Sequence, residues 1–217
     1  MIRALVFDFD GVIVDTETPL VEAWVELHAE HGIACDRAHA REVVGHVGVT
    51  FDLWAGFGAR ADRAALEQAY RLRARALITQ QPVLPGVCEL LRAARARGLR
   101  IAIASNSDHA HVDGHLDRLG LRTWFDAVCC VDDVAAGKPA PDLYLLATRI
   151  LDAPPGAAIA FEDSVPGHTA AKRAGVHTVV VPNPSTAHCR FPYADLQLPS
   201  LAHTSLDALL ARFSAAA

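Results

Sequence analysis

The sequence predicts an α/β fold, with a doubly wound parallel sheet as its core and an inserted all-helical cap domain. Two observations carry this prediction. Short apolar runs alternate with amphipathic helical stretches at the start of the chain and again from residue 83, which is typical of parallel strands joined by helices. Residues 15–82 show helical periodicity and nothing strand-like, so they interrupt that alternation. We therefore expect a core of residues 1–14 and 83–217 and a helical cap of residues 15–82.

The composition is ordinary for a soluble enzyme that acts on a small molecule. The formal net charge of −5 over 217 residues argues against nucleic-acid and anionic-membrane partners. No segment approaches the roughly 18 consecutive apolar residues that a membrane span needs, and the N-terminus shows no signal-peptide pattern. The five cysteines include no Cys-x-x-Cys pair, so neither a disulfide framework nor a zinc knuckle is indicated. We expect a cytoplasmic monomer or weak dimer.

The first strand ends in two acids. Residues 5–7 are apolar, as in an interior strand covered on both faces, and Asp8 and Asp10 follow where that strand leaves the sheet. Gly11 then breaks the run. In open α/β sheets, ligands bind outside the carboxyl ends of the strands. The end of this first strand is therefore the first candidate position for chemistry.

The remaining elements can be assigned in order from apolar periodicity and from the glycines and prolines that bound it. Four more strands are expected at residues 100–105, 127–131, 157–161 and 177–181, and the tail at 183–201 is interpreted as surface loops before a last short helix. Helices are expected at residues 20–32 and 60–78 in the cap and at residues 85–98, 143–151 and 166–174 in the core.

Polar residues follow four of the predicted strands. If the strands are parallel, these residues meet at one edge of the sheet, and carboxylates gathered there repel one another unless a cation lies among them. Hard oxygen ligands select Mg²⁺, and Mg²⁺ with a lysine and a hydroxyl describes a site for phosphoryl transfer. The four groups are Asp8 with Asp10, Ser105-Asn106-Ser107, Gly137-Lys138-Pro139 and Glu162-Asp163-Ser164.

This set resembles the four motifs of the haloacid dehalogenase superfamily, in the same order, and the helical insert resembles the cap of its phosphoglucomutase-like branch. The resemblance implies a Rossmann-like core and a magnesium-dependent phosphatase that hydrolyses a small phosphorylated metabolite through an aspartyl phosphate. The matching segments are Asp8-Phe9-Asp10-Gly11-Val12, Ala104-Ser105-Asn106, Gly137-Lys138-Pro139-Ala140-Pro141-Asp142 and Glu162-Asp163-Ser164.

The resemblance also implies individual roles. Asp8 is expected to be the nucleophile, and Asp10 the acid and base that protonates the leaving oxygen and then deprotonates water. Ser105 and Lys138 are expected to contact the phosphoryl group. The expected magnesium ligands are Asp8, Asp163 and Asp10 through its backbone carbonyl, supported by Glu162, and the further candidates for substrate binding are Asn106, His46 and Arg73.

Alternatives within and outside the family remain. Dehalogenases lack the second aspartate, and cap-dependent phosphonatases need a cap lysine, whereas the lysines here are Lys138 and Lys172, both in the core. A sugar-phosphate mutase is closer, but Leu20 stands where those mutases place a histidine and Gly45–Gly48 occupies the loop of their cap arginine. A phospho-accepting signalling or binding module is the non-enzyme alternative, against which Asp10 and the cap both argue.

Overall fold

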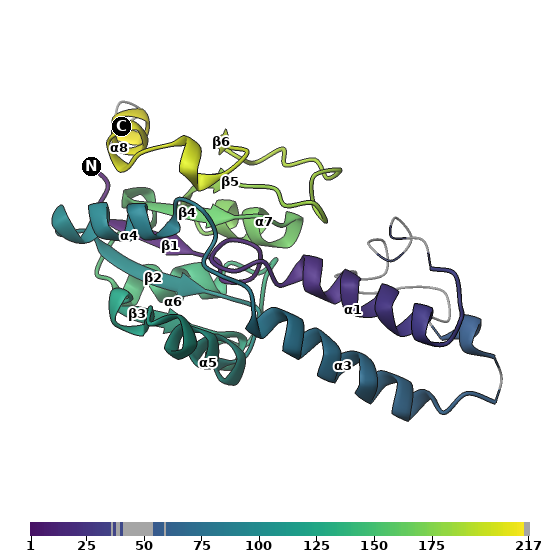
Figure 1. Ribbon diagram of the computed structural model, residues 1–217. Coiled ribbons are helices and arrows are strands. Elements are labelled where there is room, and N and C mark those ends of the chain that lie inside the picture. Colours follow the sequence, from purple (N-terminus) through teal and green to yellow (C-terminus); the bar gives the residue numbers. More distant parts are fainter. Residues whose placement is uncertain (36, 38–39, 41–53, 59, 215–217) are drawn as a thin grey trace. The chain divides into compact units, whose positions relative to one another are not determined.

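The computed structural model describes residues 1–35, 37, 40, 54–58 and 60–214, and Figure 1 shows its elements. The chain divides into two compact units. One contains Met1–Val14 and Pro82–Ala217, and the other contains Asp15–Gln81. Within the described residues no helix is both long enough and apolar enough to cross a membrane.

A six-stranded sheet forms the centre of the first unit, and all its strand pairs are parallel. The strand order is β3-β2-β1-β4-β5-β6, so that β1 lies between β2 and β4 (Figure 1). This arrangement confirms the predicted fold class. The strands are β1 (Ala4–Phe7), β2 (Arg100–Ala104), β3 (Ala127–Cys129), β4 (Ala158–Glu162), β5 (His177–Val180) and β6 (Leu196–Gln197).

The sixth strand was not predicted, because the tail was interpreted as loops. Its two residues are too short to show any alternation of apolar and polar side chains. It is recognisable only from its partner, since Leu196 pairs with Val179 and the backbone N–H of Leu198 donates to Val180 O at 2.9 Å.

Helices cover both faces of the sheet. Alternate residues of a strand point to opposite faces, and accordingly Leu5 and Phe7 belong to one apolar cluster and Ala4 and Val6 to another. The first cluster includes residues of α4 (Val87–Ala96), α5 (His109–Leu119) and α8 (Leu206–Ser214), and the second includes residues of α6 (Asp142–Ile150) and α7 (Val165–Arg173). Short 3₁₀ helices lie at η2 (Arg122–Trp124), η3 (Val131–Asp133), η4 (Pro155–Ala157) and η5 (Leu201–His203).

The second unit is helical and has an apolar centre of its own. Its described elements are α1 (Glu17–Glu30), the 3₁₀ turn η1 (Ala55–Phe57) and α3 (Arg63–Thr79). Trp24 packs against Trp54 and Tyr70, with ring centroids 4.8 and 5.4 Å away. Such aromatic contacts bury much apolar area per residue, and they form an apolar cluster made of this unit's own residues.

Candidate active site

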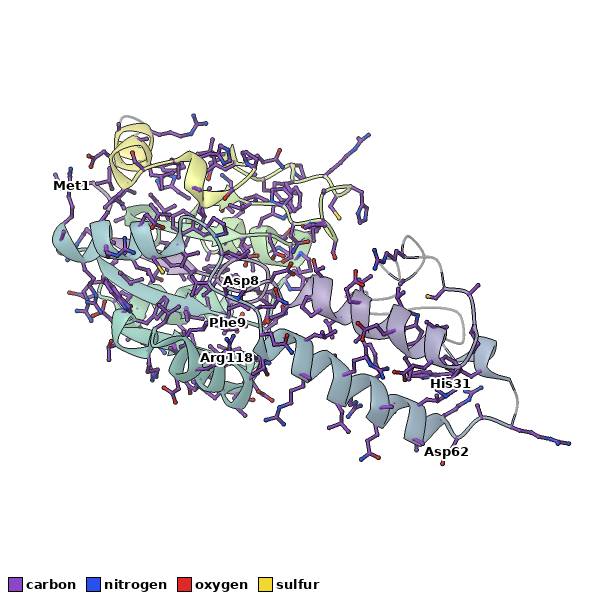
Figure 2. The ribbon with its side chains drawn as sticks, in the orientation of Figure 1. Met1, Asp8, Phe9, His31, Asp62 and Arg118 are labelled. Carbon is purple, nitrogen blue, oxygen red and sulfur yellow. The ribbon has the colours of Figure 1, made fainter. Side chains whose placement is uncertain are left out.

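The predicted site begins directly beyond β1, where Asp8 is almost fully buried. Figure 2 labels Asp8 and its neighbour Phe9 at this end of the strand. Asp8 Oδ1 accepts a hydrogen bond from the Phe9 amide at 2.7 Å and lies 2.9 Å from Lys138 Nζ. Burial and the nearby charge of Glu162 raise the pKa of Asp8 to about 8, although Lys138 acts in the opposite direction. The surroundings of Asp8 therefore disfavour its ionised form, and additional positive charge nearby would stabilise the carboxylate.

Glu162, the last residue of β4, is fully buried and is held by three side chains. Its Oε1 accepts from Lys138 Nζ at 2.6 Å and from the Tyr144 hydroxyl, and its Oε2 accepts from Ser164 Oγ at 3.2 Å. Burial by itself would lower the pKa of Lys138, but the Asp8 and Glu162 carboxylates outweigh it and raise that pKa. Lys138 is therefore a fixed cation between two carboxylates.

Asp163, the next residue, is positioned by a residue from the tail. Asn183 Nδ2 donates to Asp163 Oδ2 at 2.6 Å. Asn183 Oδ1 in turn accepts from the backbone amides of Ser185 and Thr186 at 2.8 and 3.1 Å, which fixes the amide in place. Sequence reasoning missed Asn183. The available signal was its place in an Asn-Pro-Ser segment, where asparagine side chains commonly bond the backbone a few residues on.

Gly11 is required where β1 leaves the sheet. Its φ is +76°, and a Cβ built there would lie 2.1 Å from Asp163 Oδ2 and 2.8 Å from Asn183 Nδ2. Glycine adopts this left-handed conformation without strain, and it leaves room for the carboxylate of Asp163. The glycine of the first motif therefore makes space for an acid of the fourth.

Asp8, Glu162 and Asp163 form a group that could hold a metal ion. One carboxylate oxygen from each residue lies within 4.8 Å of the other two, and all three residues are buried. The three acids face one buried lysine, so a divalent cation would bring the charges close to balance, and carboxylate oxygens suit Mg²⁺. The residues present therefore fit a magnesium ion.

The Asp10 carboxylate makes contacts outside that group. Ser107 Oγ donates to Asp10 Oδ2 at 2.6 Å, and His111 Nε2 lies 2.9 Å from Asp10 Oδ1. The hydrogen bond to Asp10 outweighs burial and raises the pKa of His111. His111 lies on α5, outside the four motifs, so the motifs give no indication of its contact with Asp10.

The second motif supports the lysine of the third. Asn106 Oδ1 accepts from the Lys138 amide at 2.7 Å, and Asn106 Nδ2 donates to Lys138 O at 3.1 Å. Both ends of this side-chain amide thus bind the backbone of Lys138. Ser105 is buried, and its Oγ accepts from the Ser107 amide at 3.0 Å. This loop therefore fixes Lys138, and it places Ser105 directly after β2, beside β1 in the sheet.

Two candidate residues belong to the cap. His46 lies outside the described residues. Arg73, on α3, pairs within the cap with Glu26 at 3.3 Å and with Glu30 at 2.5 Å. The negative charge of these two carboxylates exceeds the single positive charge of the guanidinium, so binding a substrate anion would require Arg73 to give up at least part of this pairing.

The comparison with known families agrees with the geometry of the core. A family model described as haloacid dehalogenase-like hydrolase matches residues 2–175. The chain belongs to this family. The match includes all four segments that the resemblance was based on, and it confirms that resemblance.

The similarity extends along nearly the whole chain. The protein named "Putative phosphatase YhcW" of Bacillus subtilis (strain 168) is 40% identical over 220 residues, or 97% of each chain. Hexitol phosphatase B of Escherichia coli (strain K12) is 31% identical over 215 residues, which cover 96% of this chain and 97% of that protein. A crystal structure described as "putative beta-phosphoglucomutase" from Thermotoga maritima has a TM-score of 0.79 and 25% identity, and it covers 93% of this chain and 96% of that one.

Proposed function

We propose that this haloacid dehalogenase-like hydrolase is a magnesium-dependent phosphatase that hydrolyses a small phosphorylated metabolite through an aspartyl phosphate on Asp8. One observation supports the proposal above all: the buried Asp8 carboxylate lies 2.9 Å from Lys138 Nζ and within 4.8 Å of carboxylate oxygens of Glu162 and Asp163. A nucleophile, a fixed cation and oxygen ligands for a metal are the components of a phosphoryl-transfer site.

In the first step, Asp8 attacks phosphorus while the ester P–O bond breaks. The two contacts described above both reach Oδ1 of Asp8, so we assign the attack to Oδ2. Asp10 gives a proton to the leaving oxygen, which departs as an alcohol. Lys138 Nζ and Ser105 Oγ contact the phosphoryl oxygens and stabilise their charge.

In the second step, water attacks the phosphorus of the aspartyl phosphate. Asp10 removes a proton from that water, the bond between phosphorus and Asp8 breaks, and inorganic phosphate leaves. Asp8 is then a free carboxylate again, and Asp10 again carries the proton it needs for the next substrate.

Asp8 and Asp163 would hold the magnesium ion with the backbone carbonyl of Asp10, and Glu162 would support them. When bound, Mg²⁺ supplies positive charge to the phosphoryl oxygens. Glu162 is already bonded to Lys138, Tyr144 and Ser164, which suits a supporting role that orients the lysine.

The test is release of inorganic phosphate from 4-nitrophenyl phosphate, measured with Mg²⁺ and with a chelator. We expect activity only with Mg²⁺, and we expect Asp8→Asn to lose at least about a thousandfold, because the nucleophile is removed. Asp117→Asn, an exposed aspartate on α5, is the matched control and should retain activity. Full activity of Asp8→Asn, or of the wild type in chelator, would contradict the mechanism.

A sugar-phosphate mutase is the second candidate, favoured by the likeness to the Thermotoga maritima structure. Against it, Leu20 on α1 packs beside the apolar cluster of the cap instead of offering a polar contact. A panel of sugar phosphates separates the two activities, since a phosphatase releases phosphate whereas a mutase forms an isomer. The proposal includes a cytoplasmic location and a monomer or weak dimer, and gel filtration tests the latter.

A further inference from the structure

His111 lies outside the four motifs but contacts the residue to which the proton transfers are assigned. It is in the first turn of α5, and its Nε2 lies 2.9 Å from Asp10 Oδ1. Its backbone N–H donates to Asp108 Oδ1 at 2.8 Å, which caps the helix and fixes the start of α5. The motifs alone give no reason for a histidine at this position.

The ring of His111 is held by its neighbours. It packs edge-on against Phe9, with centroids 5.8 Å apart and an interplanar angle of 89°, and its centroid lies 4.8 Å from that of His115. Phe9 is fully buried and immediately precedes Asp10. The ring that contacts Asp10 is therefore positioned against the same segment that carries Asp10.

The carboxyl group of an aspartate needs such contacts to keep one orientation. The torsion that turns the carboxyl plane has broad minima, so the backbone alone does not fix it. Here Ser107 Oγ contacts one oxygen at 2.6 Å and His111 Nε2 contacts the other at 2.9 Å. Two contacts on two different oxygens define the plane of the carboxyl group. Proton transfer depends on this orientation, because donor and acceptor must come within hydrogen-bond reach.

We propose that His111 is a positioning residue that orients the Asp10 carboxyl for proton transfer to the leaving oxygen. The inference rests on the proposed function, in which Asp10 is the acid and base. This role of His111 predicts a specific kinetic effect. Loss of the contact should matter most when the leaving group is a poor one, because such a group depends on protonation in the transition state.

Two aryl phosphates of similar shape test this kinetic prediction. Phenol is a weaker acid than 4-nitrophenol, so the phenyl ester needs the proton more. We expect His111→Phe, which keeps an aromatic ring beside Phe9 but has no donor, to lower kcat/KM at least about tenfold on phenyl phosphate and less than threefold on 4-nitrophenyl phosphate. His111→Gln, whose amide nitrogen can replace Nε2, should restore most of the loss on phenyl phosphate.

His109→Phe is the matched control. His109 also lies in the first turn of α5 and also contacts carboxylates, but these belong to Asp113 and Asp133. It should leave the ratio of kcat/KM for the two substrates unchanged. Circular dichroism checks that each variant is folded, and His111→Leu replaces His111→Phe in the same comparison if the latter does not fold.

The outcomes separate this inference from the proposed function. A wild-type protein inactive on both esters overturns the proposed function and this inference with it. An active wild type whose His111 variants lose equally on both esters, or lose nothing, overturns the role of His111 alone. The same conclusion follows if His109→Phe shows the same selective loss.

Discussion

At the scale of single residues, Glu162 shows how a buried charge is made tolerable. A buried carboxylate costs several kcal/mol in lost hydration unless charge and hydrogen bonds compensate. Lys138, Tyr144 and Ser164 supply these bonds from three different segments. Burial of Tyr144 itself, together with the charge of Glu162, raises the pKa of Tyr144 well above its usual value, so the phenol stays a donor. Glu162 is thus fixed in one position, so neighbouring residues must leave room for its side chain.

Gly167, in α7, leaves room for the Glu162 side chain because it has no Cβ. A Cβ at this position would lie 1.8 Å from Glu162 Oε2. We expect Gly167→Ala to lower the free energy of unfolding by about 2 to 5 kcal/mol, because Glu162 can move away only by breaking its buried bonds. The measurement is chemical denaturation followed by circular dichroism.

Gly114, on the exposed side of α5, is the matched control for this substitution, since a Cβ there meets nothing within 4 Å. Alanine is the better helix former by about 0.5 to 1 kcal/mol, so Gly114→Ala should stabilise the protein. Equal effects of the two substitutions would contradict the packing around Glu162.

The sequence could identify the residues that come directly after strands but not those that reach them from elsewhere. Asp8, Ser105 and Asp163 each follow an apolar run, so parallel strands bring them to one edge. Asn183 and His111 were missed, because their contacts depend on how a loop and a helix pack in three dimensions. Tyr144 carried a weak signal, since a tyrosine in an apolar helical stretch needs a partner for its hydroxyl.

At the scale of elements, Asp126 joins two strands and a helix at the start of β3. Its Oδ2 accepts from the Ile101 amide of β2 at 2.8 Å, and its Oδ1 lies 3.1 Å from Arg95 Nη1 of α4 and 3.2 Å from Arg100 Nε. Burial would raise the pKa of Asp126, but the amide and the two guanidinium groups outweigh it and lower that pKa. The ionised carboxylate is therefore the form that stabilises the fold.

Asp126→Asn should accordingly lower the free energy of unfolding at pH 7 by about 1 to 3 kcal/mol, the range for hydrogen bonds to charged groups. Because the folded pKa lies below the unfolded one, the wild-type advantage is present in full above the unfolded pKa and is lost as the pH falls through the folded pKa. Urea denaturation at pH 7, 5 and 3 measures this. A difference that stays constant down to pH 3 would show that the carboxylate charge is not the cause.

Asp207→Asn provides the comparison. Asp207 pairs with Arg97 on the surface, where its side chain is 70% exposed. Exposed pairs contribute at most about 1 kcal/mol, so this substitution should change stability little at any of these pH values.

The strands of the core were predictable as elements because continuous apolar runs mark strands buried on both faces. The exact ends of helices and strands were less predictable. The helix expected from residue 60 begins at Arg63, because Asp62 caps it by accepting from the Ala65 amide at 3.1 Å. Acidic N-caps of this kind can be read from sequence, whereas β6 cannot, since its pairing with β5 alone makes it a strand.

At the scale of the whole molecule, the two units have separate apolar centres. The two clusters on the faces of the sheet contain residues of the first unit, and the cluster around Val21 and Trp24 contains residues of the second. The chain leaves the sheet unit after Val14 and returns at Pro82. At this junction Val14 forms an antiparallel bridge with Val83, and the Leu84 amide donates to Ile13 O at 2.8 Å. Both segments of this junction belong to the first unit.

The core should therefore fold without the cap. Replacing residues 15–81 with a Gly-Ser linker of about four residues joins segments that are already paired, and linkers of this length close antiparallel pairs in many proteins. We expect a single cooperative thermal transition by circular dichroism, because both apolar clusters of the sheet remain complete. Asp8, Glu162 and Asp163 remain as well, so Mg²⁺ should raise the transition temperature of this shortened protein, and Asp8→Asn should reduce that rise. An aggregated product, or one without a cooperative transition, would show that the sheet unit depends on the cap for its stability.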